Sequence, residues 1–356
     1  MNKRTACALT LSFLTLPVLA QSGAPPAVAP VSDAAAAAPV QQAPDAPALD
    51  APADAVPAQI VVSGKRPGPG LWKVSKGEHV MWVFGLHSPL PQKMEWDAAR
   101  VERLVAQSQE VLQPPSAGVG TGFFGMLTAL PAMIGMKKNP DGATLHDVLP
   151  SDVYARWQVL KGKYIGDDDD VERYRPIFAS SELMEAGLKK SGLTNSVAVR
   201  KQIEKIADKN NVKITATGFR VEIDNPGRAL RDFKQSSMED VACFTKTLEH
   251  LEGDIDASRL RANAWANGNI ADISKLDYTG RTDACNDAIF GGSFARNRPE
   301  MQNMRERRQA SWLTAAEAAL DKNQATFAML SMGEILGPRS YLAALQAKGY
   351  TVESPK

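Results

Sequence analysis

His87 and Ser88 are the first residues of this chain whose types and setting point to chemistry. They come shortly after the run His79 to Phe84, which is bulky and apolar enough to be a strand buried on both faces. Polar side chains at the end of a buried strand occupy the usual place for a site in an open α/β sheet. An imidazole there can bind a metal ion and a hydroxyl can act as a nucleophile. The alternative interpretation is a buried hairpin with an incidental histidine.

The segments around this pair predict a β-β-α-β opening. Apolar residues at helical spacing predict a helix, and two prolines close the short strand that follows it. This order of elements places Glu110 or Gln113 at the same sheet edge as His87. Ser88 lacks an evident base, because its neighbour His87 is poorly placed and no third group is apparent. The predicted elements are two strands within Leu71 to Trp96 with a turn at Lys76-Gly77 and an end at Gly85, a helix over Asp97 to Ser108, and a short strand over Glu110 to Gln113.

The rest of the chain predicts an α/β fold, with a mixed central sheet flanked by helices in a single large domain that carries a helical insertion. Further strands are predicted at 212–216, 219–223, 326–331 and 350–353, with a loop at 333–338. Helices are predicted at 144–162, 173–191, 196–210, 228–251, 257–265, 270–276, 296–320 and 339–348.

The amino terminus predicts export. Residues 1–20 combine basic residues, an apolar run and the sequence Val18-Leu19-Ala20, which is typical of a cleaved signal peptide. Residues 21–58 are almost entirely Ala, Pro, Val, Asp and Gln, a composition expected of a disordered linker. The domain therefore extends over 59–356, and we expect a periplasmic or secreted protein. Only Cys243 and Cys285 remain after cleavage, which favours a disulfide in an oxidising compartment.

Composition excludes some partners. The net charge of +1 gives no basic excess for a nucleic acid or an anionic membrane. The uncharged stretch 118–136 contains a Gly-x-Gly-x-x-Gly pattern at Gly120 to Gly125, but prolines precede it instead of a strand, so we expect no dinucleotide site. The same stretch contains Pro131 and five glycines, so a packed helical hairpin or an apolar lid is preferred to a transmembrane anchor.

Both ends of the domain carry a resemblance to a known family. The start, LWKV with a strand, a glycine loop and a proline, and the end, TFAMLSMGEILGPRSYLAALQAKGYTVE, resemble the TraB/GumN family, which is related to the TIKI peptidases. The intervening features that fit are Leu145 to Pro150 with Tyr154, Arg175-Pro176, Ala264-Trp265 before Gly268-Asn269, and Arg308 four residues before Trp312. The resemblance extends from about Gly68 to Glu353.

The resemblance implies two Gly-x-x-His loops, a glutamate and an arginine at one sheet edge, arranged as in a metal-dependent peptidase site. Two imidazoles and a carboxylate can hold a divalent ion that activates water, and the arginine can stabilise an oxyanion. This chain departs from that pattern. The first histidine position holds Ser88, with His87 displaced by one residue, and the second holds Glu334. The family glutamate falls at Gln113 or Pro114, close to Glu110, and Glu222 matches a further recurrent glutamate.

Three hypotheses follow. In the first, the fold persists without its hydrolytic centre, as an exported binding or assembly protein for a peptide, glycan or protein ligand, with no cofactor. In the second, His87, Glu110 and Glu334 hold Mn, Zn or Fe in a rearranged hydrolase, with His87, Ser88, Arg308 and Glu334 as catalytic residues. In the third, Glu334 acts as a base and Arg308 as an electrostatic clamp in hydrolysis without a metal. Enzyme activity is therefore left open by the sequence.

Overall fold

A computed structural model describes residues 68–120, 130–236, 240–253, 255–275 and 280–355. These residues belong to one structural unit, Val62–Lys356. The predicted signal peptide, the predicted linker and residues 121–129 of the uncharged stretch 118–136 lie outside the described residues.

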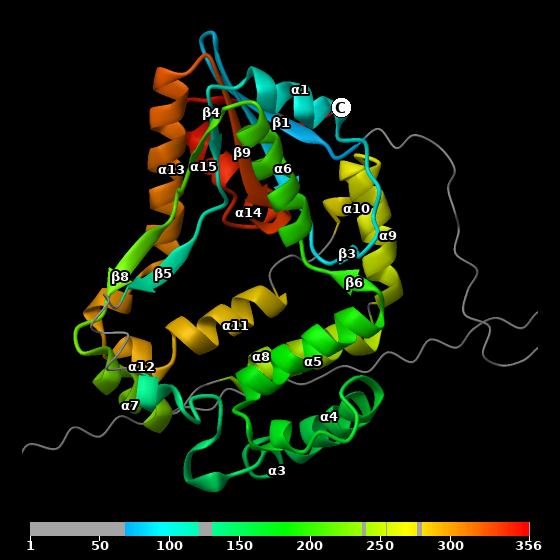
Figure 1. Cartoon of the computed structure of the whole chain (residues 1–356), viewed down its shortest axis with the longest axis vertical. Coiled ribbons are helices and arrows are strands. Elements are labelled where there is room, and N and C mark those ends of the chain that lie inside the picture. Colours follow the sequence, from blue (N-terminus) through cyan, green and yellow to red (C-terminus); the bar gives the residue numbers. More distant parts are fainter. Residues whose placement is uncertain (1–67, 121–129, 237–239, 254, 276–279, 356) are drawn as a thin grey trace, which may run out of the picture. The chain divides into compact units, whose positions relative to one another are not determined.

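The structure is a mixed α/β arrangement, as the sequence predicts (Figure 1). The strands are β1 (Leu71–Lys76), β2 (His79–Leu86), β3 (Leu90–Pro91), β4 (Glu110–Leu112), β5 (Ala117–Gly120), β6 (Leu193–Thr194), β7 (Lys213–Thr215), β8 (Phe219–Glu222), β9 (Ala325–Ser331) and β10 (Thr351–Glu353). The helices are α1 (Ala99–Gln107), α3 (Leu145–Val148), α4 (Ser151–Tyr164), α5 (Pro176–Lys190), α6 (Val197–Lys209), α7 (Pro226–Gln235), α8 (Val241–Gly253), α9 (Ile255–Ala266), α10 (Ile270–Ile273), α11 (Gly280–Phe290), α12 (Ser293–Arg296), α13 (Met304–Lys322), α14 (Met332–Leu336) and α15 (Tyr341–Ala347).

The central sheet has six strands in the order β10-β1-β2-β9-β4-β7. β1 pairs antiparallel with β2 and β10, whereas β2, β9, β4 and β7 run parallel. The carboxyl ends of these four parallel strands therefore meet at one edge of the sheet, where sites in α/β folds usually lie. β5 and β8 form a separate parallel pair, and β3 pairs with β6.

The segments after Gly85 and before Gly337 lie side by side, as expected from the resemblance, which places two such loops at one sheet edge. Gly85 is level with Leu330, and Leu86 is level with Ser331, in the parallel pair β2 and β9. A Cβ atom on Gly85 would lie 2.3 Å from Sδ of Met332, so only glycine lets α14 pack this closely on β2. The end of β2 and the start of α14 are thus closely packed.

Two hydrophobic clusters organise the unit. The larger one surrounds the sheet, with α13 and α6 on opposite sides of it (Figure 1). The second cluster lies among α3, α4, α5 and α8, where Trp157 and Phe244 are fully buried with ring centroids 5.4 Å apart. These four helices thus have a hydrophobic core of their own. Among the described residues, no helix combines the length and apolar character needed to cross a bilayer.

Several predicted boundaries were wrong. The hairpin turn consists of Gly77 and Glu78, because Lys76 still pairs with His79, and β2 continues through Gly85 to Leu86. The predicted helical region 228–251 contains two helices, α7 and α8, whereas the predicted helix 296–320 begins only at Met304. Residues 117–120 form the strand β5 rather than part of a helical hairpin. The predicted loop 333–338 begins as the helix α14, and α11 was not predicted.

Candidate functional site

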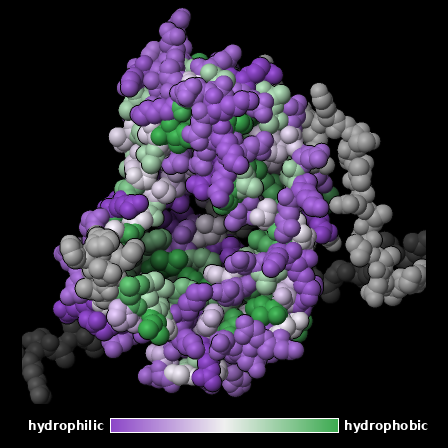
Figure 2. Space-filling model, in the orientation of Figure 1, coloured by the Kyte–Doolittle hydropathy of each residue, from purple (hydrophilic) through white to green (hydrophobic). Residues whose placement is uncertain are grey.

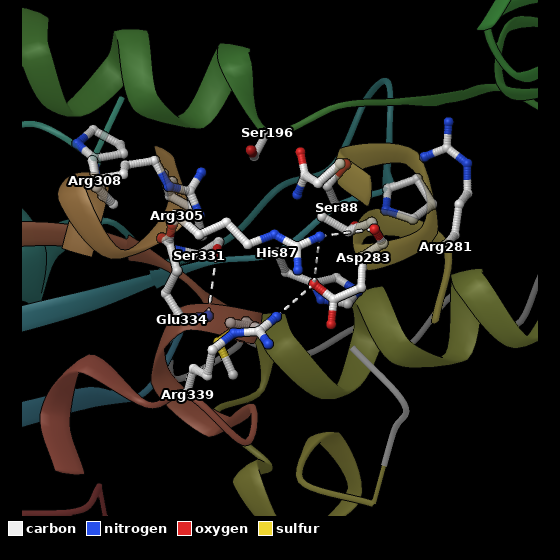
Figure 3. Close-up of a pocket in the computed structure, with 18 of the residues that line it drawn as sticks. His87, Ser88, Ser196, Arg281, Asp283, Arg305, Arg308, Ser331, Glu334 and Arg339 are labelled. Atoms are coloured by element: carbon white, nitrogen blue, oxygen red, sulfur yellow. Dashed lines mark hydrogen bonds and ion pairs between the residues drawn. The ribbon is translucent and has the colours of Figure 1, made fainter. Parts of the chain in front are cut away.

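The main pocket lies at the carboxyl edge of the parallel strands. It has a volume of about 840 Å³ and is bounded on one side by the ends of β2 and β9, and on the other by side chains of α5, α8 and α11. Figure 2 shows the surface hollowed between the sheet and these helices. His87, Ser88, Arg308 and Glu334, the four residues predicted to be catalytic, all line this pocket. Figure 3 shows them together with residues that the sequence did not point to.

His87 is the most unusual of these residues. Its side chain is 3% exposed, and neither Nδ1 nor Nε2 has a hydrogen-bond partner among the described residues. Burial lowers the pKa of the imidazole to about 4, and the charge of Arg261 contributes further. The ring is therefore neutral at pH 7. A buried polar group without a partner is costly, so it calls for a role such as contact with a ligand.

The loop that carries His87 is fixed from behind by α9. The indole nitrogen of Trp265 donates a hydrogen bond of 2.7 Å to the carbonyl oxygen of Gly85. Trp265 also packs edge-on against Phe84, with ring centroids 5.9 Å apart. Trp265 belongs to the Ala264-Trp265 pair that the resemblance singled out, and it positions the end of β2. Ser88 follows His87 as an exposed residue, and its peptide bond to Pro89 is cis.

Glu334 is the third residue of the short helix α14 and completes its capping box. Its Oε2 atom accepts a hydrogen bond of 2.9 Å from the backbone N–H of Ser331, and Oγ of Ser331 accepts from the N–H of Glu334. Its Oε1 atom lies 3.2 Å from Nη2 of Arg308. Burial raises the pKa of Glu334, while Arg308 and Ser331 oppose that rise. Both carboxylate oxygens are therefore engaged within the protein.

Glu110 was predicted to join this group, and the structure contradicts that. Glu110 begins β4 and is level with Thr326 at the start of β9, which in turn is level with Met81. His87 lies six residues further along, or about 20 Å at the rise of a strand. Glu110 is therefore at the opposite edge of the sheet from the pocket.

The contacts of Glu110 explain its residue type. Its carboxylate accepts hydrogen bonds from Lys213 at 2.9 Å, from Asn323 at 3.0 Å and from Thr215. Burial raises its pKa, but these three bonds outweigh burial and the net pKa is lowered. Glu110 thus joins β4 to β7 and to the segment before β9. Glu222, at the exposed end of β8, contributes nothing to the pocket either.

The metal hypothesis fails a test of its donor set. Among the described residues, no three His, Cys, Asp or Glu side chains lie close enough together to hold a metal ion. With Glu110 at the far edge, the predicted set is reduced to His87 and Glu334, and Glu334 is already bonded to Arg308 and Ser331. The residues present do not fit the ion that the resemblance implies.

The helical side of the pocket was missed by sequence reasoning. Asp283 on α11 accepts from Arg339 at 2.8 Å, and its backbone carbonyl oxygen accepts from Arg305 on α13 at 2.9 Å (Figure 3). The sequence signal that could have pointed to α11 is Cys285. Its Sγ lies 2.01 Å from Sγ of Cys243, so a disulfide joins α11 to α8. This pairing agrees with the predicted bond.

The comparison with protein families agrees with this geometry. A sequence profile of the TraB/PrgY/gumN family matches residues 70–354. The chain belongs to this family. No curated protein and no solved structure matches the chain significantly. The matched range begins just before β1 and ends after β10, so the TraB/PrgY/gumN match spans the whole central sheet and both walls of the pocket.

Proposed function

We propose that this TraB/PrgY/gumN protein is an exported binding or assembly accessory protein, periplasmic or secreted, whose family pocket holds a ligand without metal-dependent hydrolysis. The ligand is a peptide, a glycan or an anionic part of a partner protein. Pocket volume supports this proposal, because about 840 Å³ is within the range of sites that enclose small ligands.

One observation carries the proposal. Glu334 stands where the resemblance expects the second imidazole. One of its carboxylate oxygens accepts the hydrogen bond of the capping box, and the other pairs with Arg308. A metal ion bound there would have to compete with these two interactions for the carboxylate oxygens. The first expected imidazole position is Ser88, and the adjacent His87 is buried as a neutral ring. The pocket is therefore present, but its described residues do not supply the donors that a metal ion needs.

The test combines turnover and ligand retention on the mature full chain. Peptide, ester and glycoside libraries are incubated with the protein and Mn²⁺, Zn²⁺ or Fe²⁺, and we expect no hydrolysis above that of a His87→Ala variant. Native mass spectrometry of protein from an exporting host should show a bound mass that Ser88→Trp, which fills the pocket, removes. The control Arg156→Met changes a half-buried residue that pairs with Glu252 outside the pocket, and it should retain the mass. Metal-dependent hydrolysis lost in His87→Ala would overturn the proposal.

A second candidate function is hydrolysis without a metal ion. The observation that favours it is the raised pKa of Glu334, caused by burial, beside a guanidinium. A carboxyl group in such a setting is suited to proton transfer, and Arg308 can stabilise an oxyanion. This function predicts turnover that survives a metal chelator and is lost in Glu334→Gln.

A further inference from the structure

The pocket has an excess of positive charge that the rest of the chain does not share. Seven Lys and Arg residues line it against four Asp and Glu residues, whereas the whole chain has a net charge of only +1. The basic side chains come from both walls, with Arg308 on α13 and Arg281 on α11. In Figure 3 these two lie at opposite sides of the view, with His87 and Asp283 between them. A concave site of one sign concentrates ions of the opposite sign.

Arg281 is the clearest of these unused charges. Its Nε donates to Oγ1 of Thr247 at 3.1 Å, and no carboxylate among the described residues pairs with its guanidinium. Burial lowers the pKa of Arg281, which reflects the cost of holding its charge away from water. A partly buried guanidinium without an anion gains most from a ligand that brings one.

The centre of the pocket already shows this preference for anionic oxygens. Arg305 and Arg339 converge on Asp283, although they come from α13 and from the segment after α14. Arg305 also pairs with Asp287 at 2.7 Å. Each guanidinium has five N–H donors in a fixed plane, so donors remain on both arginines for further anionic oxygens.

His87 supplies a neutral polar group at the base of the same pocket. Both of its ring nitrogens are buried and without partners among the described residues, so a ligand can meet a donor or an acceptor there. His87 lines the same pocket as the arginines. Its unpartnered nitrogens are evidence for a ligand that does not depend on the charge of the arginines.

We infer that the pocket binds a ligand with two or more oxyanion groups, one facing Arg281 and another facing Arg305, Arg308 and Arg339, with His87 contacting the part between them. The inference rests on the proposed function and specifies its ligand class. Phosphate esters and polycarboxylates share this chemistry. The volume of about 840 Å³ exceeds what a single inorganic anion needs, so it has room for a ligand with more than one such group.

Isothermal titration calorimetry on the mature full chain tests this, with pyrophosphate in one arm and tricarballylate in the other. Saturable binding of pyrophosphate alone indicates a phosphate ligand, and binding of tricarballylate alone indicates a carboxylate ligand. Arg281→Met should weaken binding about tenfold or more, and higher salt should weaken it in the wild type. The control Arg156→Met, outside the pocket, should bind as the wild type does.

Two further variants guard against misfolding. Arg339 is 54% exposed, so Arg339→Met should fold and weaken binding. Asp283→Asn removes the internal carboxylate that competes with the ligand, so it should tighten binding severalfold, whereas mere structural damage would weaken it. No saturable binding of either probe, or equal affinities for Arg281→Met and Arg156→Met, would overturn the inference. Pyrophosphate that is bound and then cleaved would leave the inference standing and sink the proposed function.

Discussion

Arg308 and Glu334 form an ion pair of 3.2 Å across the junction of α13 and α14, at the edge where the parallel strands end. The same carboxylate closes the capping box of α14. This double use ties the residue that replaces the expected second histidine to the local fold. Under the proposed function, this pair stabilises the local fold where the family pattern has a metal donor, and it can be tested separately from any ligand.

The coupling between Arg308 and Glu334 should be measurable by a double-mutant cycle with Arg308→Met and Glu334→Gln. Because the side chain of Arg308 is 34% exposed, we expect a coupling energy of about 1 kcal/mol, below that of a fully buried pair. Urea unfolding of the four proteins gives this value. Glutamine at the same position still serves a capping box, so Glu334→Gln alone should cost little beyond the loss of this coupling. A coupling energy of zero would mean that the pair has no stabilising role.

Gly85 should not tolerate a side chain. In Gly85→Ala the new Cβ atom meets Sδ of Met332 at 2.3 Å and a ring carbon of Trp72 at 3.1 Å. Overpacking of this kind costs about 1–3 kcal/mol, and we expect the free energy of unfolding to fall by that amount. Gly77→Ala is not a matched control because its φ is positive, so Gly162→Ala, which meets nothing within 4 Å, is used instead. Unchanged stability in Gly85→Ala would show that α14 packs elsewhere.

His87 should make stability depend on pH in acid. Its pKa falls from 6.5 in the unfolded chain to about 4 in the fold, so the unfolded state binds more protons between these values. The neutral ring is favoured in the fold, and the stability present above pH 6.5 is lost as the pH falls towards 4, by an amount on the order of 3 kcal/mol. Glu334 has the opposite effect, because its pKa is raised in the fold. Its contribution to the free energy of unfolding falls as the pH rises above its unfolded pKa.

The comparison with His87→Gln isolates the imidazole from Glu334 and from all other groups. The free energy of unfolding of the wild type minus that of the variant should fall as the pH falls from 7 to 4. A difference that stays constant across this range would show that His87 titrates normally.

The disulfide should support the helical wall of the pocket. Cys243 and Cys285 are 42 residues apart in sequence, and a loop of that length closed by a disulfide is stabilised by about 2–4 kcal/mol. We expect a reductant to lower the melting temperature of the wild type. The double variant Cys243→Ser, Cys285→Ser should already melt at the lower temperature and should not respond to the reductant. Equal melting of all samples would show that the bond adds nothing.

Apolar runs around a short turn were enough to predict the hairpin of β1 and β2. The proximity of β2 and β9 was predicted from the family resemblance, and the pairing of the two cysteines from their number in a protein expected to be exported. Glu110 was misplaced because its position in a short strand depends on register, which three residues do not specify. The bonds from Lys213, Thr215 and Asn323 fix it at the other end.

Arg281 and Asp283 were missed for a different reason. Their helix α11, with the sequence GRTDACNDAIF, contains Gly, Thr, Asp and Asn, which are weak helix formers, and it has no apolar stripe of regular spacing. Contacts with α8 and the disulfide hold it in place, and tertiary contacts of this kind cannot be read from local sequence.

The central claim is that the family pocket persists in this chain without a set of metal ligands. Elemental analysis by mass spectrometry tests it most directly, on mature protein equilibrated with Mn²⁺, Zn²⁺ or Fe²⁺ at neutral pH and then separated from free ions. We predict a metal content well below one atom per chain that is the same in the His87→Ala variant. One tightly held atom per chain, lost in both His87→Ala and Glu334→Gln, would contradict the claim.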